Sequence, residues 1–115
     1  MENKTTRTPF ILVVTSTPDE KEARHIIHVL LEQRLIAAGK IIRDVESRYW
    51  WQGKIEAARE YVVVLKTRQT HFKAIDETIH AIHSYHVPEL IALPIVDGAP
   101  SYLTWLKEAT QPERH

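Results

Sequence analysis

Runs and spacings of apolar residues along the chain predict an alternation of strands and helices. Residues 10–14 form an unbroken apolar run rich in β-branched side chains, between Pro9 and Pro18. This pattern is typical of a central strand covered on both faces. Residues 17–20 then provide a capping box with proline at the first helical position, so a helix is expected to start there. Gly39 marks the break after this helix. The apolar residues of the helix recur at helical spacing: Ala23, Ile26, Ile27, Leu30 and Leu31.

Two longer strands are predicted next, at about residues 40–51 and 55–67. Gln52-Gly53 between them indicates a tight hairpin turn. Toward the end of the second strand, apolar residues occupy successive positions. Because neighbouring side chains of a strand point to opposite faces, both faces of this strand are expected to be apolar there.

The second half of the chain repeats the strand and helix signals. Pro88 is expected to end a second helix, since the residue before a proline is pushed toward extended geometry. Residues 90–96 predict a short strand, in which Pro94 favours a sheet edge or a bulge. Pro100 begins a last helix. The second helix is indicated by Phe72, Ile75, Ile79 and Ile82, and one face of the last helix by Tyr102, Trp105, Leu106 and Ala109.

This order predicts an α+β fold of the ferredoxin-like, split βαβ type. Two βαβ halves meet at the hairpin, and a C-terminal helix follows; the sheet is antiparallel, with the two helices of the halves on one face. No linker or low-complexity stretch separates the halves. We therefore expect one domain over residues 9–111, a disordered tail over residues 1–8 and a short C-terminal tail over residues 112–115. With 115 residues, 43% of them hydrophobic, the chain can bury a core of its own.

The predicted hairpin is longer than the domain that carries it. A domain of this length has a radius of gyration of roughly 13 Å, hence a diameter of roughly 34 Å. A strand of thirteen residues extends about 43 Å. The hairpin end carries Tyr49, Trp50 and Trp51, which would form an exposed apolar patch unless another subunit covers them. This favours a homo-oligomer with these residues at the interface, closed into a ring. The alternative is that bulges fold the arms back onto the same subunit.

Composition excludes several classes of function. Fifteen basic and fifteen acidic residues cancel, so the basic surface that nucleic acid or an anionic membrane requires is missing. The absence of cysteine excludes disulfides, zinc fingers and cysteine nucleophiles. Residues 1–8 are polar, and no apolar run reaches the length of a membrane span. The expectation is a cytoplasmic protein that neither binds nucleic acid nor enters a membrane.

Potential metal ligands or acid–base groups recur at every third position between residues 77 and 89: Glu77, His80, His83, His86 and Glu89. On a helix, each step of three drifts by about 60°, so these groups follow a spiral and only neighbours are expected to act together. His80 and His83 are the pair that this spacing favours. The alternative is a solvated polar flank. The chain has no nucleophile elbow, phosphate-binding loop or zinc-protease motif, so an enzyme is not expected.

Five segments together resemble the CutA divalent-cation tolerance family, and the resemblance extends over about residues 10–110. The family is known for a ferredoxin-like subunit in a homotrimer, similar in architecture to PII signalling proteins. The resemblance therefore implies a cytoplasmic homotrimer linked to tolerance of copper and other divalent metals, with no firmly attached enzymatic activity. The segments are residues 13–19 (VVTSTPD), 47–55 (SRYWWQGKI), 65–67 (LKT), 83–90 (HSYHVPEL) and 102–106 (YLTWL).

The same resemblance implies candidate metal ligands. The histidine and glutamate to which metal binding is ascribed in some members match His83 and Glu89, so these are the candidate ligands for a divalent metal ion, with copper suspected. The cysteine of that site corresponds to Thr15, and Gly39 stands where many members have cysteine. A Cu(I) thiolate site is therefore excluded, whereas imidazole and carboxylate suit Cu(II), Ni(II) or Zn(II).

A second hypothesis is a PII-like small-molecule sensor or signalling scaffold that uses a cleft between subunits. Lys66 would bind an anionic group, Tyr85 lies near the corner between the second helix and the last strand, and Trp51 from the hairpin could cover the ligand. The alternative for Lys66 is an ion pair with Glu89 across the subunit boundary.

Overall fold

The computed structural model describes residues 8–112. Residues 1–7 of the predicted N-terminal tail (1–8) and residues 113–115 of the predicted C-terminal tail (112–115) lie outside the described residues. Thr8, which was expected to be part of the disordered tail, donates a hydrogen bond from its hydroxyl to the carbonyl of Ile95. The elements follow in the order β1 (Phe10–Thr17), α1 (Glu20–Glu32), β2 (Ala38–Trp51), β3 (Lys54–Arg68), α2 (Phe72–Ile82), β4 (Ile91–Pro94) and α3 (Pro100–Ala109). A short 3-10 turn, Gln69–His71, connects β3 to α2.

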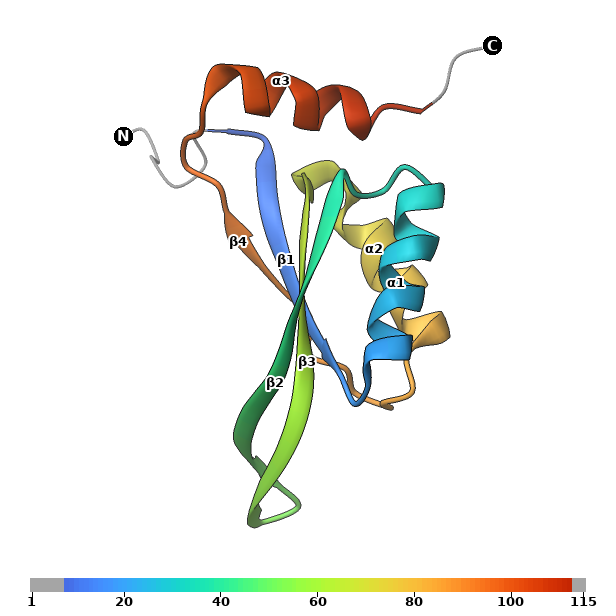
Figure 1. Cartoon of the computed structure of the whole chain (residues 1–115), viewed down its shortest axis with the longest axis vertical. Coiled ribbons are helices and arrows are strands. Elements are labelled where there is room, and N and C mark those ends of the chain that lie inside the picture. The colour runs from blue at the N-terminus through green and yellow to red at the C-terminus, as the bar shows by residue number, and fades with distance from the viewer. Residues whose placement is uncertain (1–7, 113–115) are drawn as a thin grey trace.

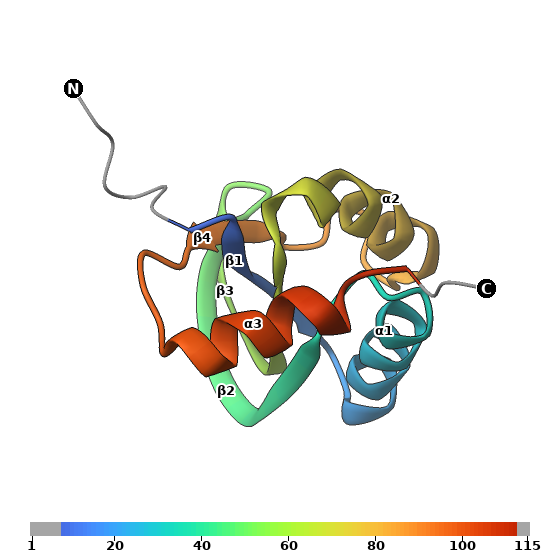
Figure 2. The ribbon, with the colours of Figure 1, turned by 90° about the horizontal axis from the view of Figure 1, so that it is seen from above.

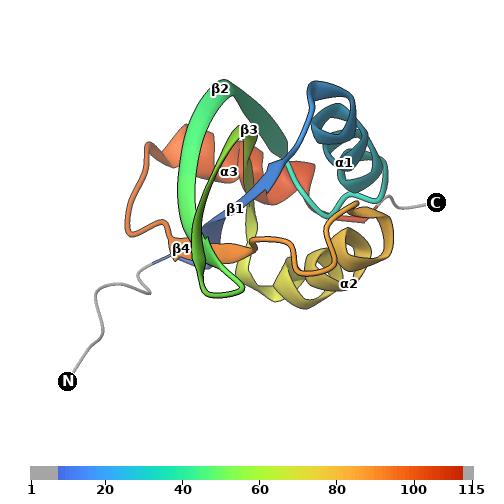
Figure 3. The same cartoon turned by 90° about the horizontal axis from the view of Figure 1, so that it is seen from below.

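The four strands form one sheet in the order β2-β3-β1-β4, and every neighbouring pair is antiparallel. α1 and α2 lie side by side on one face of the sheet (Figure 3). α3 crosses over the end of the sheet where β1 begins and β3 ends (Figures 1 and 2). This confirms the ferredoxin-like, split βαβ fold with an additional C-terminal helix. None of the helices in the described residues is long and apolar enough to cross a membrane.

The core lies between the sheet and the pair α1 and α2. On the sheet side, Val13 is paired with Leu65, and both are fully buried. Ile26 from α1 and Ile75 from α2 are fully buried against them. Each such side chain stabilises the fold by about 1.5–3 kcal/mol on burial. The full set of buried core residues is Ile11, Val13, Ala23, Ile26, Leu30, Ile36, Val63, Leu65, Ile75 and Ile79.

The opposite face of the sheet is also apolar, as predicted for β3, but it has no helix pair over it. Val14 is paired with Val64 on one side and with Ile91 on the other, so the three side chains form a row across the sheet. Ile91 and Ile42 are 50% and 51% exposed. We call this surface the open sheet face; its apolar residues are Leu12, Val14, Ile42, Val62, Val64, Ile91 and Leu93.

The β2–β3 hairpin projects well beyond the body of the domain (Figure 1). Gln52 and Gly53 both have positive φ, 49° and 79°, which is the geometry of a type I′ turn. A bulge between Ile42 and Val45 interrupts the ladder but does not return the arms to the body. Trp50 is 71% exposed near the tip. The radius of gyration, 15.3 Å, exceeds the roughly 13 Å of a compact chain of this length. The predicted overhang is confirmed; its burial against another subunit stays a prediction.

The first helix begins later than the sequence predicted. Asp19, not Thr17, caps it: the Asp19 carboxylate accepts a hydrogen bond from the Glu22 N–H at 2.8 Å. Thr17 remains in β1, paired with Tyr61. The strand therefore continues for three residues past the apolar run, because the pairing with β3 extends to this point.

Gly39 was expected to end the first helix, and this expectation was wrong. The helix ends at Glu32, and Arg34, two residues later, has a positive φ of 59°. Gly39 lies inside β2, directly under α1. A Cβ at this position would meet Cγ1 of Ile27 at 2.8 Å. The glycine thus allows the helix to approach the strand.

The second helix ends earlier than Pro88, at Ile82. His83 follows in extended geometry, with φ −79° and ψ 141°. The last strand is also shorter than predicted, Ile91–Pro94 in place of residues 90–96. It lies at the edge of the sheet, as Pro94 indicated.

Candidate functional site

The imidazole of His83 lies at the end of α2 with none of its side-chain surface exposed. Its Nε2 is 2.7 Å from the carbonyl oxygen of Ser16, and its Nδ1 is 2.9 Å from the backbone nitrogen of Tyr85. A carbonyl accepts and a backbone N–H donates, so these partners assign the proton to Nε2 and the lone pair to Nδ1. Both nitrogens of His83 are therefore bound within the chain. A metal ion at either nitrogen would have to replace one of these bonds.

The carboxylate next to His83 belongs to Glu22, in the first turn of α1. Its Oε2 is 3.2 Å from Nδ1 of His83 and accepts a hydrogen bond from the Ser84 N–H at 2.9 Å. Glu89 is exposed, and no hydrogen bond or ion pair joins it to His83 in the described residues. Within residues 8–112 of one chain, the carboxylate that contacts His83 is therefore that of Glu22.

Tyr85 extends this cluster toward β3. Its ring lies 4.9 Å from the His83 ring, centroid to centroid, and its hydroxyl donates a hydrogen bond to Oε2 of Glu60 at 2.9 Å. Glu60 is only 7% exposed. Burial, and then the hydrogen bond to Glu60, raise the pKa of the Tyr85 hydroxyl above its ordinary value. We call Glu22, Glu60, His83 and Tyr85 the His83 cluster.

The other groups of the 77–89 run do not join this cluster. His80 lies on the exposed side of α2, where its Nδ1 is 2.9 Å from a carboxylate oxygen of Asp76. His86 is exposed as well. His80 and His83 therefore have different partners within residues 8–112, because the helix ends between them and the imidazole of His83 turns into the protein.

Over residues 8–112, no three His, Asp or Glu side chains are placed to hold a metal ion together. Thr15, at the position implied for the cysteine, has a buried hydroxyl with no hydrogen-bond partner among residues 8–112. A hydroxyl is a poor substitute for a thiolate ligand. The residues of a single chain therefore do not fit a closed metal site, which normally has four ligands, or an open one with three.

The residues of the predicted ligand pocket are far apart within one chain. Lys66 donates a hydrogen bond to the Tyr102 hydroxyl at 2.9 Å, and its ammonium lies 5.0 Å from the centre of that ring. Lys66 is six positions along β3 from Glu60, the partner of Tyr85, which corresponds to about 20 Å. Trp51 lies farther still, at the hairpin tip. These side chains can share a cleft only if more than one chain builds it.

Sequence reasoning missed Glu22 and Glu60. Glu22 resembles an ordinary acidic residue in the first turn of a helix, which the helix dipole favours. Glu60 lies in a strand among charged neighbours. Both become recognisable only when the sheet order brings the end of β1, the middle of β3 and the end of α2 to one place.

A family model described as CutA1 divalent ion tolerance protein matches residues 11–109. The chain is 37% identical over 111 residues to the rice (Oryza sativa) protein named "Protein CutA 1, chloroplastic", covering 96% of this chain and 63% of that protein. It is 39% identical over 99 residues to the divalent-cation tolerance protein CutA of Thermus thermophilus, covering 86% of this chain and 96% of the relative. The chain thus spans about three fifths of the plant protein and nearly all of the bacterial one.

Solved structures agree with the fold. The crystal structure of CutA1 from Oryza sativa superposes with a TM-score of 0.88 at 36% identity, covering 94% of this chain and 99% of the other. The structure of the divalent cation tolerance protein from Thermus thermophilus gives a TM-score of 0.86 at 38% identity, covering 89% and 99%.

Proposed function

The chain belongs to the CutA1 divalent ion tolerance family, and we propose that it acts as a cytoplasmic homotrimer in the handling of divalent metal ions, copper first among them. The family match over residues 11–109 carries this proposal. It includes the open sheet face, the hairpin and the whole of the His83 cluster.

The open sheet face and the hairpin tip support the assembly. Both expose large apolar side chains within residues 8–112, Ile42 and Ile91 on the sheet and Trp50 at the tip, and a large exposed apolar patch marks an interaction surface. A closed ring buries the same two surfaces in every copy. Three copies is the number that the resemblance to the PII architecture implies.

For the metal we propose His83 and Glu89 as the ligands that each chain supplies. Imidazole and carboxylate suit Cu(II), Ni(II) and Zn(II). Because residues 8–112 of one chain do not bring three ligands together, we propose that another copy supplies the remainder. Metal at Nδ1 of His83 would displace the Tyr85 N–H and would meet the Glu22 carboxylate, 3.2 Å from that nitrogen.

Two measurements test this proposal. Light scattering should give a mass three times the 13.4 kDa of one chain. In a competitive copper titration, Glu89→Gln and His83→Ala should each weaken binding by about tenfold or more, by analogy with other changes at metal sites. His28→Ala, which removes an exposed histidine paired with Glu32 on α1, is the matched control and should have no effect. A monomer, or equal copper affinity in all four proteins, would contradict the proposal.

A PII-like sensor is the second candidate function. It is favoured by Lys66, an ammonium whose partner in the described residues is the uncharged Tyr102. Together with Tyr85 and Trp51 from other copies, it would bind an anionic metabolite between subunits. Thermal-shift screening of nucleotides and metabolites with metal removed tests this: stabilisation that disappears in Lys66→Met supports a sensor, because a ligand that binds the folded state raises its melting temperature.

A further inference from the structure

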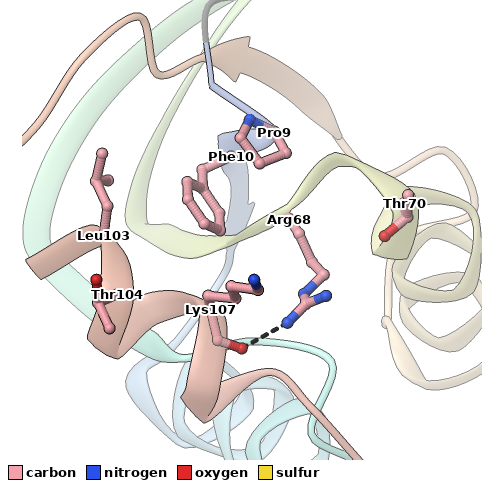
Figure 4. A pocket seen from close by; sticks show the side chains of 7 residues that line it. All are labelled: Pro9, Phe10, Arg68, Thr70, Leu103, Thr104 and Lys107. Atoms are coloured by element: carbon pink, nitrogen blue, oxygen red, sulfur yellow. Dashed lines mark hydrogen bonds between the residues drawn. The ribbon is translucent and has the colours of Figure 1, made fainter. Parts of the chain in front are cut away.

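A pocket opens under α3, at the opposite end of the sheet from the His83 cluster. Its volume is about 350 Å³, within the range of small-molecule sites. Three separate segments build it: the start of β1, the end of β3 with the turn after it, and one side of α3 (Figure 4). The metal proposal and the sensor proposal use none of its residues.

The polar part of the pocket is cationic. Arg68 and Lys107 line it together with the hydroxyl-bearing Thr70 and Thr104, and no acidic residue is among its lining residues. In Figure 4 the Lys107 ammonium lies on the same side of the pocket as the Arg68 guanidinium, below the Phe10 ring. Two like charges held in one depression favour a ligand that carries negative charge.

Neither cation is neutralised by an acid within residues 8–112. Arg68 donates from Nε to the Thr110 hydroxyl at 2.8 Å and from Nη2 to the backbone carbonyl of Lys107, both of which are uncharged acceptors. These bonds use two of the five N–H donors of a guanidinium and hold it in one orientation. They leave Nη1 and the second N–H of Nη2, the pair of donors that binds a carboxylate in bidentate fashion.

The remainder of the lining is apolar. Pro9, Phe10 and Leu103 supply a ring and aliphatic surface beside the cations. Phe10 is almost fully buried, so its position is set by the fold and not by a ligand. Such a mixed lining selects a molecule with one charged end and a short apolar body.

We propose that this pocket binds a small amphipathic carboxylate, with its carboxylate on Arg68 and Lys107 and its apolar body against Phe10 and Leu103. Phe10 begins β1 and Ser16, the partner of His83, lies six residues later, so the two sites are about 20 Å apart. Binding here is therefore independent of metal at His83, and it fails or succeeds separately from the proposed function.

The probe is hexanoate, with 1-hexanol and hexylammonium as controls of the same chain length. Binding to the full chain is followed by amide chemical shifts in a nitrogen-15 labelled sample, and a Kd on the order of 1 mM is expected for so small a ligand. Shifts should be largest at Phe10, Arg68 and Leu103, and should be absent with either control compound. Loss of one charged partner should weaken binding by about tenfold.

Arg68→Gln tests the guanidinium, but it also removes the bonds that hold α3. Lys107→Met is the second variant, because it keeps the backbone carbonyl that Arg68 binds. Arg59→Gln, an exposed arginine of the hairpin paired with Asp44, is the matched control and should bind hexanoate normally. Weakening in both pocket variants and none in the control supports the proposal. Equal binding of hexanol, equal affinity in Lys107→Met, shifts located elsewhere, or no shifts at millimolar hexanoate would each overturn it.

Discussion

Replacing His83 by alanine is expected to destabilise the protein strongly, whatever its role with metal. The substitution removes two part-buried hydrogen bonds: the one to the Ser16 carbonyl, now 2.7 Å long, and the one from the Tyr85 N–H, now 2.9 Å long. Each unsatisfied buried group costs about 1–3 kcal/mol. The contact with the Tyr85 ring is lost as well. A loss of about 2–5 kcal/mol in the free energy of unfolding follows.

Urea unfolding monitored by tryptophan fluorescence measures this loss. The protein concentration has to be the same for every variant, because the stability of an oligomer depends on it. His80→Ala is the control: it removes the same side chain three positions earlier, where it is exposed and paired with Asp76, and it should cost no more than about 0.5 kcal/mol. If His83→Ala costs no more than His80→Ala, the buried hydrogen bonds assigned to His83 are refuted.

This prediction also decides which variant tests metal binding cleanly. A loss of copper affinity in His83→Ala combines the loss of a ligand with damage to the end of α2. Glu89→Gln changes an exposed side chain that takes no part in the His83 cluster. A loss of affinity there, with unchanged unfolding, can be assigned to the metal site alone.

Three further predictions concern other parts of the fold. Gly39→Ala should destabilise the protein by about 1–3 kcal/mol in urea unfolding, because the new methyl meets Ile27 at 2.8 Å. The destabilisation should be smaller when Ile27 is also replaced by alanine. If it is unchanged in the double variant, the contact with Ile27 is not the cause. The free energy of unfolding should fall as pH rises above about 10, because the pKa of Tyr85 is raised in the folded state while the unfolded phenol ionises near 10.0. Tyr85→Phe should reduce this dependence of stability on pH. If the dependence is the same in Tyr85→Phe, another group is its source. Arg43→Gln should raise the pKa of Glu20, which the hydrogen bond from Arg43 now lowers. A lowered carboxyl pKa contributes stability that is present above its unfolded value, near 4.5, and is lost as the pH falls below it, so any stability difference between variant and wild type should disappear at acid pH. A carboxyl pKa that stays the same in an NMR titration would contradict this.

The strands and the topology could be predicted because they depend on local patterns. The apolar run from residue 10, the Gln52-Gly53 turn and Pro94 at the edge each specify a neighbour or a boundary through the conformation of a few residues. Helix ends were predicted less well. Gly39 satisfied the usual signal for a helix end, yet it is required by the packing of Ile27, which lies twelve positions earlier. A glycine signals either freedom of the backbone or closeness of a neighbour, and the sequence does not distinguish them.

The surroundings of His83 could not be predicted for a related reason. The spacing of three in the 77–89 run suggested partners on the same helix, whereas the actual partner Ser16 is 67 positions away and Glu22 binds the neighbouring Ser84 from 62 positions away. Contacts at this separation depend on the order of strands in the sheet, not on periodicity. The choice of His83 itself came from family resemblance, and its burial is something that only the fold reveals.

The incomplete ligand set and the open sheet face lead to the same requirement. Within residues 8–112, no three candidate ligands meet, and one face of the sheet exposes large apolar side chains. These observations are independent, because the first concerns polar groups near α2 and the second apolar residues of the strands. A second copy of the chain would resolve both. Metal affinity should therefore fall together with oligomer mass when Ile42 on the open face is replaced by lysine, since a charge there opposes burial. If a monomeric Ile42→Lys protein still binds copper tightly, metal binding does not depend on oligomerisation, and the site must lie within one chain.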